Sequence, residues 1–160
     1  MFSIRDMTGQ DRDAVMSMVL EFYHSPAVEH EVDAATLEKT FWDAVDPAEG
    51  LLRGLLLEED GEAVGYAYVT FCYSGEMGGR VVFFDELYFR PQCRGKGYGT
   101  QVFRWLKREY PDYPRFRLEV TEANEKAARL YARLGFRTLE YRQMVLDGDL
   151  AQGERKENLE

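Results

Sequence analysis

The feature that most constrains the fold of this chain is a glycine-rich turn between an apolar run and an amphipathic segment. Residues Val81–Arg90 (VVFFDELYFR) are apolar on both faces, which is typical of a central strand covered by helices. After Pro91 the sequence reads QCRGKGYGT, and Val102, Phe103 and Leu106 then repeat with helical spacing. The sequence therefore predicts a strand, a glycine-rich turn and a helix, in that order.

Such a turn can hold an anion such as a pyrophosphate. A helix N-terminus presents unpaired N–H groups and a partial positive charge, and glycine permits positive φ and a close approach of the backbone. Arg94 and Lys96 add positive charge beside the turn. A glycine-rich turn can also be purely structural, so the turn alone leaves both interpretations open.

Two other phosphate-binding loops fit this sequence less well. A P-loop requires G-x-x-x-x-G-K-[ST], and no Lys-Ser or Lys-Thr pair follows the glycines here. A dinucleotide-binding loop requires G-x-G-x-x-G near the start of a βαβ unit. Gly95 and Gly97 lack the third glycine at that spacing, and they lie past the middle of the chain.

The rest of the pattern predicts an α/β fold, namely a mixed sheet with helices on both faces. Besides the helix that follows the turn, apolar residues at helical spacing predict helices over 11–23, 34–45 and 124–134. Further strands are expected at 51–58, 63–73 and 116–121, with one or two more at 136–146. A turn at 59–62 joins the first two strands as a hairpin. Residues 1–147 are expected to form a single domain, followed by a polar tail at 148–160.

Composition narrows the classes of function. The formal net charge of −9 argues against a nucleic-acid partner, because neutralising phosphates needs a basic face. No apolar run approaches the roughly 18 residues of a membrane span, and no signal peptide is recognisable. Cys72 and Cys93 form no C-x-x-C pair and are expected to be free thiols in a reducing cytoplasm. With two histidines and no metal-binding motif, no metal is expected.

Two motifs together resemble the GNAT superfamily of acyl-CoA N-acyltransferases. The first, Q-x-x-G-x-G, begins at Gln92 and is similar to the CoA pyrophosphate loop of that family. The second, N-x-x-A-x-x-x-Y followed by GF, begins at Asn124 and has its tyrosine at Tyr131. Two motifs in the family's order and separation are much more specific than either alone. They span about residues 81–137, and the order of predicted elements extends the resemblance to nearly the whole chain.

The resemblance implies a mostly antiparallel sheet in which two parallel strands, here 81–90 and 116–121, splay apart around the pantetheine arm of acetyl-CoA. It also implies which residues bind the cofactor: Leu87, Tyr88, Phe89, Gln92, Arg94, Gly95, Lys96, Gly97, Tyr98, Gly99, Thr100, Asn124 and Tyr131. Asn124 stands equally where it can cap its own helix.

Acetyl transfer to an amine makes its own chemical demands. The amine, with a pKa near 10, must lose a proton before it attacks the thioester. The tetrahedral oxyanion needs a hydrogen-bond donor, and the departing thiolate needs a proton. Tyr131 occupies the position of the family's general acid. Tyr131 also shares a helical face with Ala127 and Leu134, so a core aromatic is the alternative.

Asp85 and Glu86 are the candidates for the general base. Successive residues of a strand face opposite sides, so one of the two is expected to face the acceptor, although a bulge could re-aim either. The sequence around them resembles that of diamine acetyltransferases, in whose register Asp85 replaces a glutamate base. A charge pair that only orients the backbone is the alternative role.

The acceptor is expected to be a primary amine of a small molecule, and the negative charge of the chain favours a cation. The resemblance implies that the first two helices shape its site, which the residues between them could line: Tyr23, His24, Glu29, His30 and Glu31. Acetylation of a protein lysine or N-terminus is one alternative. A non-catalytic CoA sensor is another, but the presence of Tyr131 and of both carboxylates argues against it. Paired subunits are common in the family, so a homodimer is a further expectation.

Overall fold

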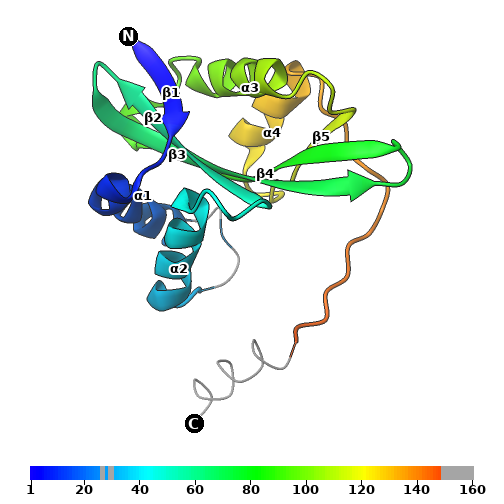
Figure 1. Cartoon of the computed structure of the whole chain (residues 1–160). Helices are drawn as coiled ribbons and strands as arrows, with labels where there is room; N and C mark the ends of the chain where they lie inside the picture. The colour runs from blue at the N-terminus through cyan, green and yellow to red at the C-terminus, as the bar shows by residue number, and fades with distance from the viewer. Residues whose placement is uncertain (26–27, 29–30, 149–160) are drawn as a thin grey trace.

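The computed structural model describes residues 1–25, 28 and 31–148. They form a five-stranded sheet in the order β1-β2-β3-β4-β5, with helices on both faces (Figure 1). The strands are β1 (Phe2–Asp6), β2 (Leu52–Glu59), β3 (Glu62–Ser74), β4 (Gly79–Phe89) and β5 (Arg115–Leu118). The helices are α1 (Arg12–Tyr23), α2 (Ala34–Val45), α3 (Tyr98–Glu109) and α4 (Glu125–Arg133), with 3-10 turns at Gly9–Asp11 and Pro91–Cys93.

The sheet is mostly antiparallel with one parallel pair, as the sequence predicted. Strands β1 to β4 pair antiparallel in chain order. β4 and β5 are parallel, with partners from Val81↔Arg115 to Phe84↔Leu118. The expected hairpin joins β2 to β3 through Asp60 and Gly61, whose φ angles are 54° and 84°.

Alternation along the strands gives each face of the sheet its own core. On one face, α1 and α2 contribute Val15, Met18 and Phe41, which pack with Leu56 and Tyr66. On the other face, α3 packs against the sheet, and α4 lies on this same side (Figure 1); the buried cluster there comprises Leu55, Leu57, Ala67, Val69, Val82, Phe84, Val102 and Leu106. The strand that carries the two carboxylates, β4, is therefore covered on both sides.

The ladder between β3 and β4 contains a bulge at the two carboxylates. Tyr68 pairs with Glu86 and Val69 pairs with Phe84, so Asp85 has no partner on β3. A bulge of this kind bends the strand and shifts the alternation of its side chains by one residue. Phe84 consequently faces the α3 side, whereas Tyr88 lies in the core beneath α1 and α2.

The structure differs from the sequence predictions at both chain ends. At the first, β1 was not predicted; it is a short edge strand held by pairing with β2 and by Arg5, which bridges Glu58 and Asp11. The prediction of strands at 136–146 is wrong, because none of these residues belongs to a ladder of the sheet. An alternating pattern becomes a strand only where a neighbour accepts its hydrogen bonds.

Within the described ranges, none of the helices has the length and apolar character that a membrane span needs.

Candidate active site

The parallel strands part where their pairing ends. The last pair is Phe84↔Leu118, so β5 stops three residues before the predicted end at Thr121. The bulge at Asp85 bends β4 at the same level. Beyond the bend, β4 is no longer in register with β5. Two cavities lie beyond this point, one lined by the carboxylates and one by the glycine-rich turn.

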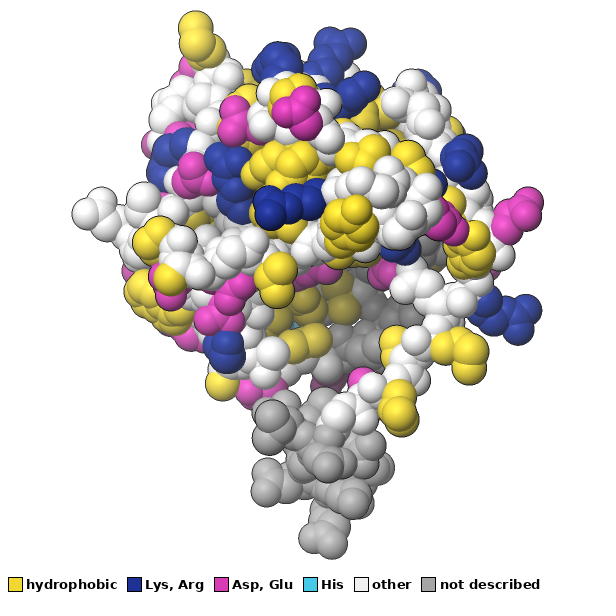
Figure 2. All heavy atoms as spheres, turned by 45° about the vertical axis from the view of Figure 1, so that its right-hand side comes forward, with side chains coloured by type: hydrophobic (Ala, Val, Ile, Leu, Met, Phe, Trp, Pro, Cys, Tyr) yellow, Lys and Arg dark blue, Asp and Glu magenta, His cyan; other side chains and the backbone are white. Residues whose placement is uncertain are grey.

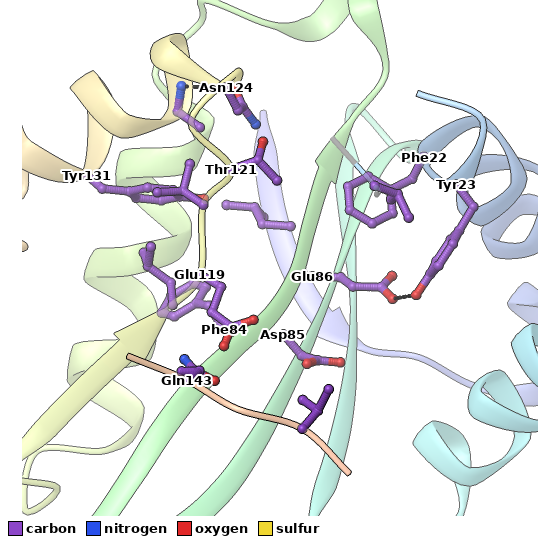
Figure 3. A pocket seen from close by; sticks show the side chains of 16 residues that line it. Phe22, Tyr23, Phe84, Asp85, Glu86, Glu119, Thr121, Asn124, Tyr131 and Gln143 are labelled. Carbon is purple, nitrogen blue, oxygen red and sulfur yellow. Dashed lines mark hydrogen bonds between the residues drawn. The ribbon is translucent and has the colours of Figure 1, made fainter. Parts of the chain in front are cut away.

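We call the first the carboxylate cavity; its volume is about 680 Å³. Its wall holds three carboxylates and no lysine or arginine among the described residues, and Figure 3 shows how ten of the lining residues lie. The wall comprises Phe22, Tyr23, Val28, Phe84, Asp85, Glu86, Leu87, Leu118, Glu119, Val120, Thr121, Asn124, Ala127, Tyr131, Gln143 and Val145.

Both adjacent carboxylates line this cavity, so the expectation that one of Asp85 and Glu86 would face away is wrong. Strict alternation would separate them, but the bulge leaves Asp85 unpaired and exposed at the bend. Glu86 follows it in the ladder and is 8% exposed. The two side chains thus reach one cavity in different environments.

Glu86 is held by two tyrosine hydroxyls. Tyr23, the last residue of α1, donates to Oε1 at 2.5 Å, and Tyr66 of β3 donates to Oε2 at 2.7 Å. Burial raises the pKa of Glu86; the two phenol hydrogen bonds oppose that rise, and the negative charge of Asp85 adds to it. Figure 3 shows the Glu86 carboxylate directed toward Tyr23.

Asp85 accepts no hydrogen bond from the described side chains, so its lone pairs are available to a ligand. Although solvent reaches Asp85, the surrounding cavity walls partly desolvate its carboxylate and raise its pKa, and the negative charge of Glu119, the residue after β5, raises it further. A carboxylate with a raised pKa binds a proton more readily than an ordinary aspartate. Asp85 can therefore take a proton from a ligand in this cavity.

The second cavity, the glycine-loop cavity, has a volume of about 580 Å³. Its wall holds Arg94, Lys126 and Arg133 and no carboxylate among the described residues. Its other lining residues are Phe22, Ser25, Leu87, Tyr88, Phe89, Cys93, Gly95, Gly97, Tyr98, Gly99, Thr100, Ala123, Asn124, Ala127, Leu130 and Tyr131. Eleven of the thirteen residues predicted to bind the cofactor are in this wall.

The glycines of the loop have the conformations that the sequence analysis expected of them. Gly95 and Gly97 have φ of 79° and 80°, and Gly97 is the N-cap of α3. No side chain caps this helix, so its first N–H groups face the loop. A Cβ on Gly99 would lie 2.9 Å from Leu130 Cδ2, so this glycine lets α3 and α4 approach each other.

The two predicted cofactor residues outside the glycine-loop cavity are Gln92 and Lys96. Gln92 is exposed in the 3-10 turn before the loop. Lys96 forms an ion pair with Glu59 at 2.7 Å, and Tyr98 donates its hydroxyl proton to the same carboxylate. The positive charge that was expected from Lys96 is thus partly neutralised, whereas Lys126 and Arg133 supply charge from α4.

The two cavities share part of their walls: Phe22, Leu87, Asn124, Ala127 and Tyr131 line both. Burial raises the pKa of Tyr131, so its phenol stays protonated, and no described residue hydrogen-bonds to the hydroxyl, although the backbone carbonyl accepts from Leu134 and Phe136. Asn124 accepts a hydrogen bond from the Ala127 N–H at 3.3 Å, so it caps α4 as well as lining the cavities. A group passed from one cavity to the other would meet Tyr131.

Several residues of the cavity walls were not predicted, although the sequence pattern indicated some of them. Lys126 and Arg133 are seven residues apart on α4, and this spacing places them on one helix face. No local pattern indicated Glu119, which lines the carboxylate cavity near Asp85, or Tyr66, which lines neither cavity but donates a hydrogen bond to Glu86. Of the loop residues considered for the acceptor site, Tyr23 lines the carboxylate cavity and His24 and Glu31 do not; Glu29 and His30 are outside the described residues.

Among the described residues no cluster of three His, Cys, Asp or Glu side chains could hold an ion.

Comparison with known proteins agrees with this geometry. The model of the acetyltransferase (GNAT) family matches residues 13–136. Thialysine N-epsilon-acetyltransferase from Mus musculus is 29% identical over 150 residues, which cover 85% of this chain and 84% of that protein. A possible acetyltransferase from Clostridium difficile 630 has a TM-score of 0.78 at 18% identity, covering 92% of this chain and 97% of that one. A predicted acetyltransferase with acetyl-CoA, from Clostridium acetobutylicum, has a TM-score of 0.72 at 19% identity, covering 91% and 96%.

The parted parallel strands and the glycine loop thus have the architecture of an acetyltransferase fold. The chain belongs to the acetyltransferase (GNAT) family, whose model covers most of it. It is an acyl-CoA-dependent N-acetyltransferase.

Proposed function

We propose that this enzyme transfers an acetyl group from acetyl-CoA to the primary amine of a small cationic molecule. The observation that carries the proposal is the opposite charge of two cavities that share a wall at Tyr131. The glycine-loop cavity has three cationic residues and no carboxylate in its described wall, which suits the phosphates of CoA. Among its described lining residues the carboxylate cavity has three acidic residues and no cation, which suits an ammonium group.

The charge of the whole chain follows the same division. Residues 91–137, which contain the glycine loop, α3 and α4, have 11 Lys and Arg against 5 Asp and Glu, although the net charge of the chain is −9. Figure 2 shows Lys and Arg side chains gathered on the upper part of this face and a hollow below them, with hydrophobic and acidic side chains at its wall. Such a separation attracts an anionic cofactor and a cationic acceptor to different sides of one site.

The residues of the two cavities have complementary roles in a direct transfer. Asp85 takes a proton from the bound ammonium group, and the nitrogen lone pair then attacks the thioester carbonyl carbon. As the C–S bond breaks, Tyr131 gives its hydroxyl proton to the departing sulfur of CoA. The nitrogen then loses its second proton to become an amide, and that proton restores the Tyr131 hydroxyl through solvent. We favour Asp85 over Glu86 as the base because its lone pairs are unoccupied, whereas both oxygens of Glu86 accept phenol hydrogen bonds.

The mouse relative that is named for thialysine acetylation supports a small primary amine as the acceptor. An acetyl-CoA turnover assay that follows thiol release tests the proposal. The panel contains thialysine, lysine, diamines, aminoglycosides, a neutral amine, and peptides with a free lysine or N-terminus. We expect the highest kcat/KM with a small cationic amine. Preferred turnover of the peptides, or no turnover of any amine, would contradict it.

A further inference from the structure

Glu86 is the one charged residue that the described part of the chain buries, with 8% of its surface exposed. A buried carboxylate is costly unless a cation or hydrogen bonds compensate for its charge. No lysine, arginine or histidine among the described residues pairs with Glu86; its described partners are the hydroxyls of Tyr23 and Tyr66. The fold therefore places a carboxyl group at the wall of the carboxylate cavity with no cation beside it among the described residues.

The two hydroxyls reach Glu86 from different layers of the fold. Tyr23 is 63 residues away in sequence and ends α1, and Tyr66 is 20 residues away on β3. Each hydroxyl donates to a different carboxylate oxygen, so together they fix the orientation of the group. An ionised carboxylate has about four acceptor sites, so two donors leave acceptor capacity for a ligand.

We propose that Tyr23 and Tyr66 are positioning residues, which keep Glu86 ionised and oriented so that it binds the cationic group of the acceptor. The inference rests on the proposed function, since it requires a cationic acceptor in the carboxylate cavity. It assigns different tasks to the adjacent carboxylates: Asp85, unpaired at the bulge, removes the proton, and Glu86 holds the charge.

The same geometry predicts how the site responds to pH. The titratable groups that face Glu86 are Tyr23 from α1, Tyr66 and Tyr68 from β3, and Asp85 beside it on β4. Phenol donors favour the ionised carboxylate, whereas burial and the charge of Asp85 disfavour it. Removing one donor therefore raises the pKa of Glu86 further. As the pH falls, Glu86 then becomes protonated at a higher pH than in the wild type. The acid limb of the kcat/KM profile therefore moves to higher pH.

Tyr23→Phe and Tyr66→Phe test the proposal because each keeps the ring and removes only the hydroxyl. We expect KM for the best cationic amine to rise roughly tenfold in each, the scale of one hydrogen bond to a charged group. The KM for acetyl-CoA should stay unchanged, and the acid limb should move to higher pH. In a Glu86→Gln background the same substitutions should add little further loss. Tyr110→Phe is the matched control, since Tyr110 accepts a hydrogen bond from Arg53 and lines neither cavity.

A second readout does not depend on activity. Titration of the Glu86 side-chain carboxyl carbon by NMR should give a higher pKa in Tyr23→Phe and in Tyr66→Phe than in the wild type, and an unchanged value in Tyr110→Phe. An unchanged Glu86 titration, or an equal rise in KM with and without Glu86, would overturn the proposal. If no amine is a substrate, the proposed function fails, and the titration still decides whether the tyrosines control Glu86.

Discussion

Replacing Gly97 by valine should separate the cost of backbone strain from the loss of cofactor binding. Gly97 has φ 80° and ψ 11°, and a Cβ there would meet no heavy atom within 4 Å. The Cβ itself meets no clash, so the expected folding cost is mainly backbone strain, roughly 1–2 kcal/mol for an L-residue in the left-handed region. For a chain of this size that is about 2–8 °C in Tm. Because Gly97 lines the glycine-loop cavity, the valine side chain also obstructs the backbone surface that the pyrophosphate would approach. We therefore expect CoA affinity to fall at least about tenfold, or about 1.4 kcal/mol.

Calorimetry with CoA and thermal unfolding measure the two effects separately. Gly78 provides a matched control, because it has φ 61°, open space at the Cβ position and no place in either cavity wall. Gly78→Val should show a comparable decrease in Tm with unchanged CoA affinity. The reasoning is refuted if folded Gly97→Val binds CoA as tightly as the wild type, or if Gly78→Val loses as much affinity.

Three further predictions concern the side chains of the two cavities. Tyr131→Phe should lower kcat by roughly 10²–10⁴, the usual cost of losing a general acid, with CoA affinity unchanged; unchanged turnover would make Tyr131 a packing residue. Asp85→Asn should lower kcat/KM most for cationic amines, and activity of the wild type should rise with pH between about 6 and 9 as the amine proton becomes easier to remove. Because the charge of Glu119 raises the pKa of Asp85, Glu119→Gln should move the acid limb to lower pH; an upward shift would contradict this. Lys126→Gln and Arg133→Gln should each weaken CoA binding measured by calorimetry, whereas Arg129→Gln, on the same helix but outside the cavity wall, should not.

The local elements of this protein could be predicted from its sequence because local interactions determine them. Apolar spacing located α2 at Ala34–Val45, and the structure has the same bounds. The expected αL conformations of the glycine turn occur at Gly95 and Gly97. The two motifs also indicated the family. One marks a strand-turn-helix unit, the other marks the end of a later helix, and their order and separation along the chain can be read from the sequence.

The arrangement of the carboxylate cavity was decided by tertiary structure. Alternation along an isolated strand separates Asp85 from Glu86, but a bulge in the ladder with β3 brings both to one cavity. The partners of Glu86 lie 63 and 20 residues away, so no local pattern could pair them. The alternating segment 136–146 forms no strand, because strand formation depends on a neighbouring edge as well as on the segment itself. The sequence by itself thus determined the conformation of the glycine loop and the family, whereas only long-range packing decided which carboxylate is free and which is held.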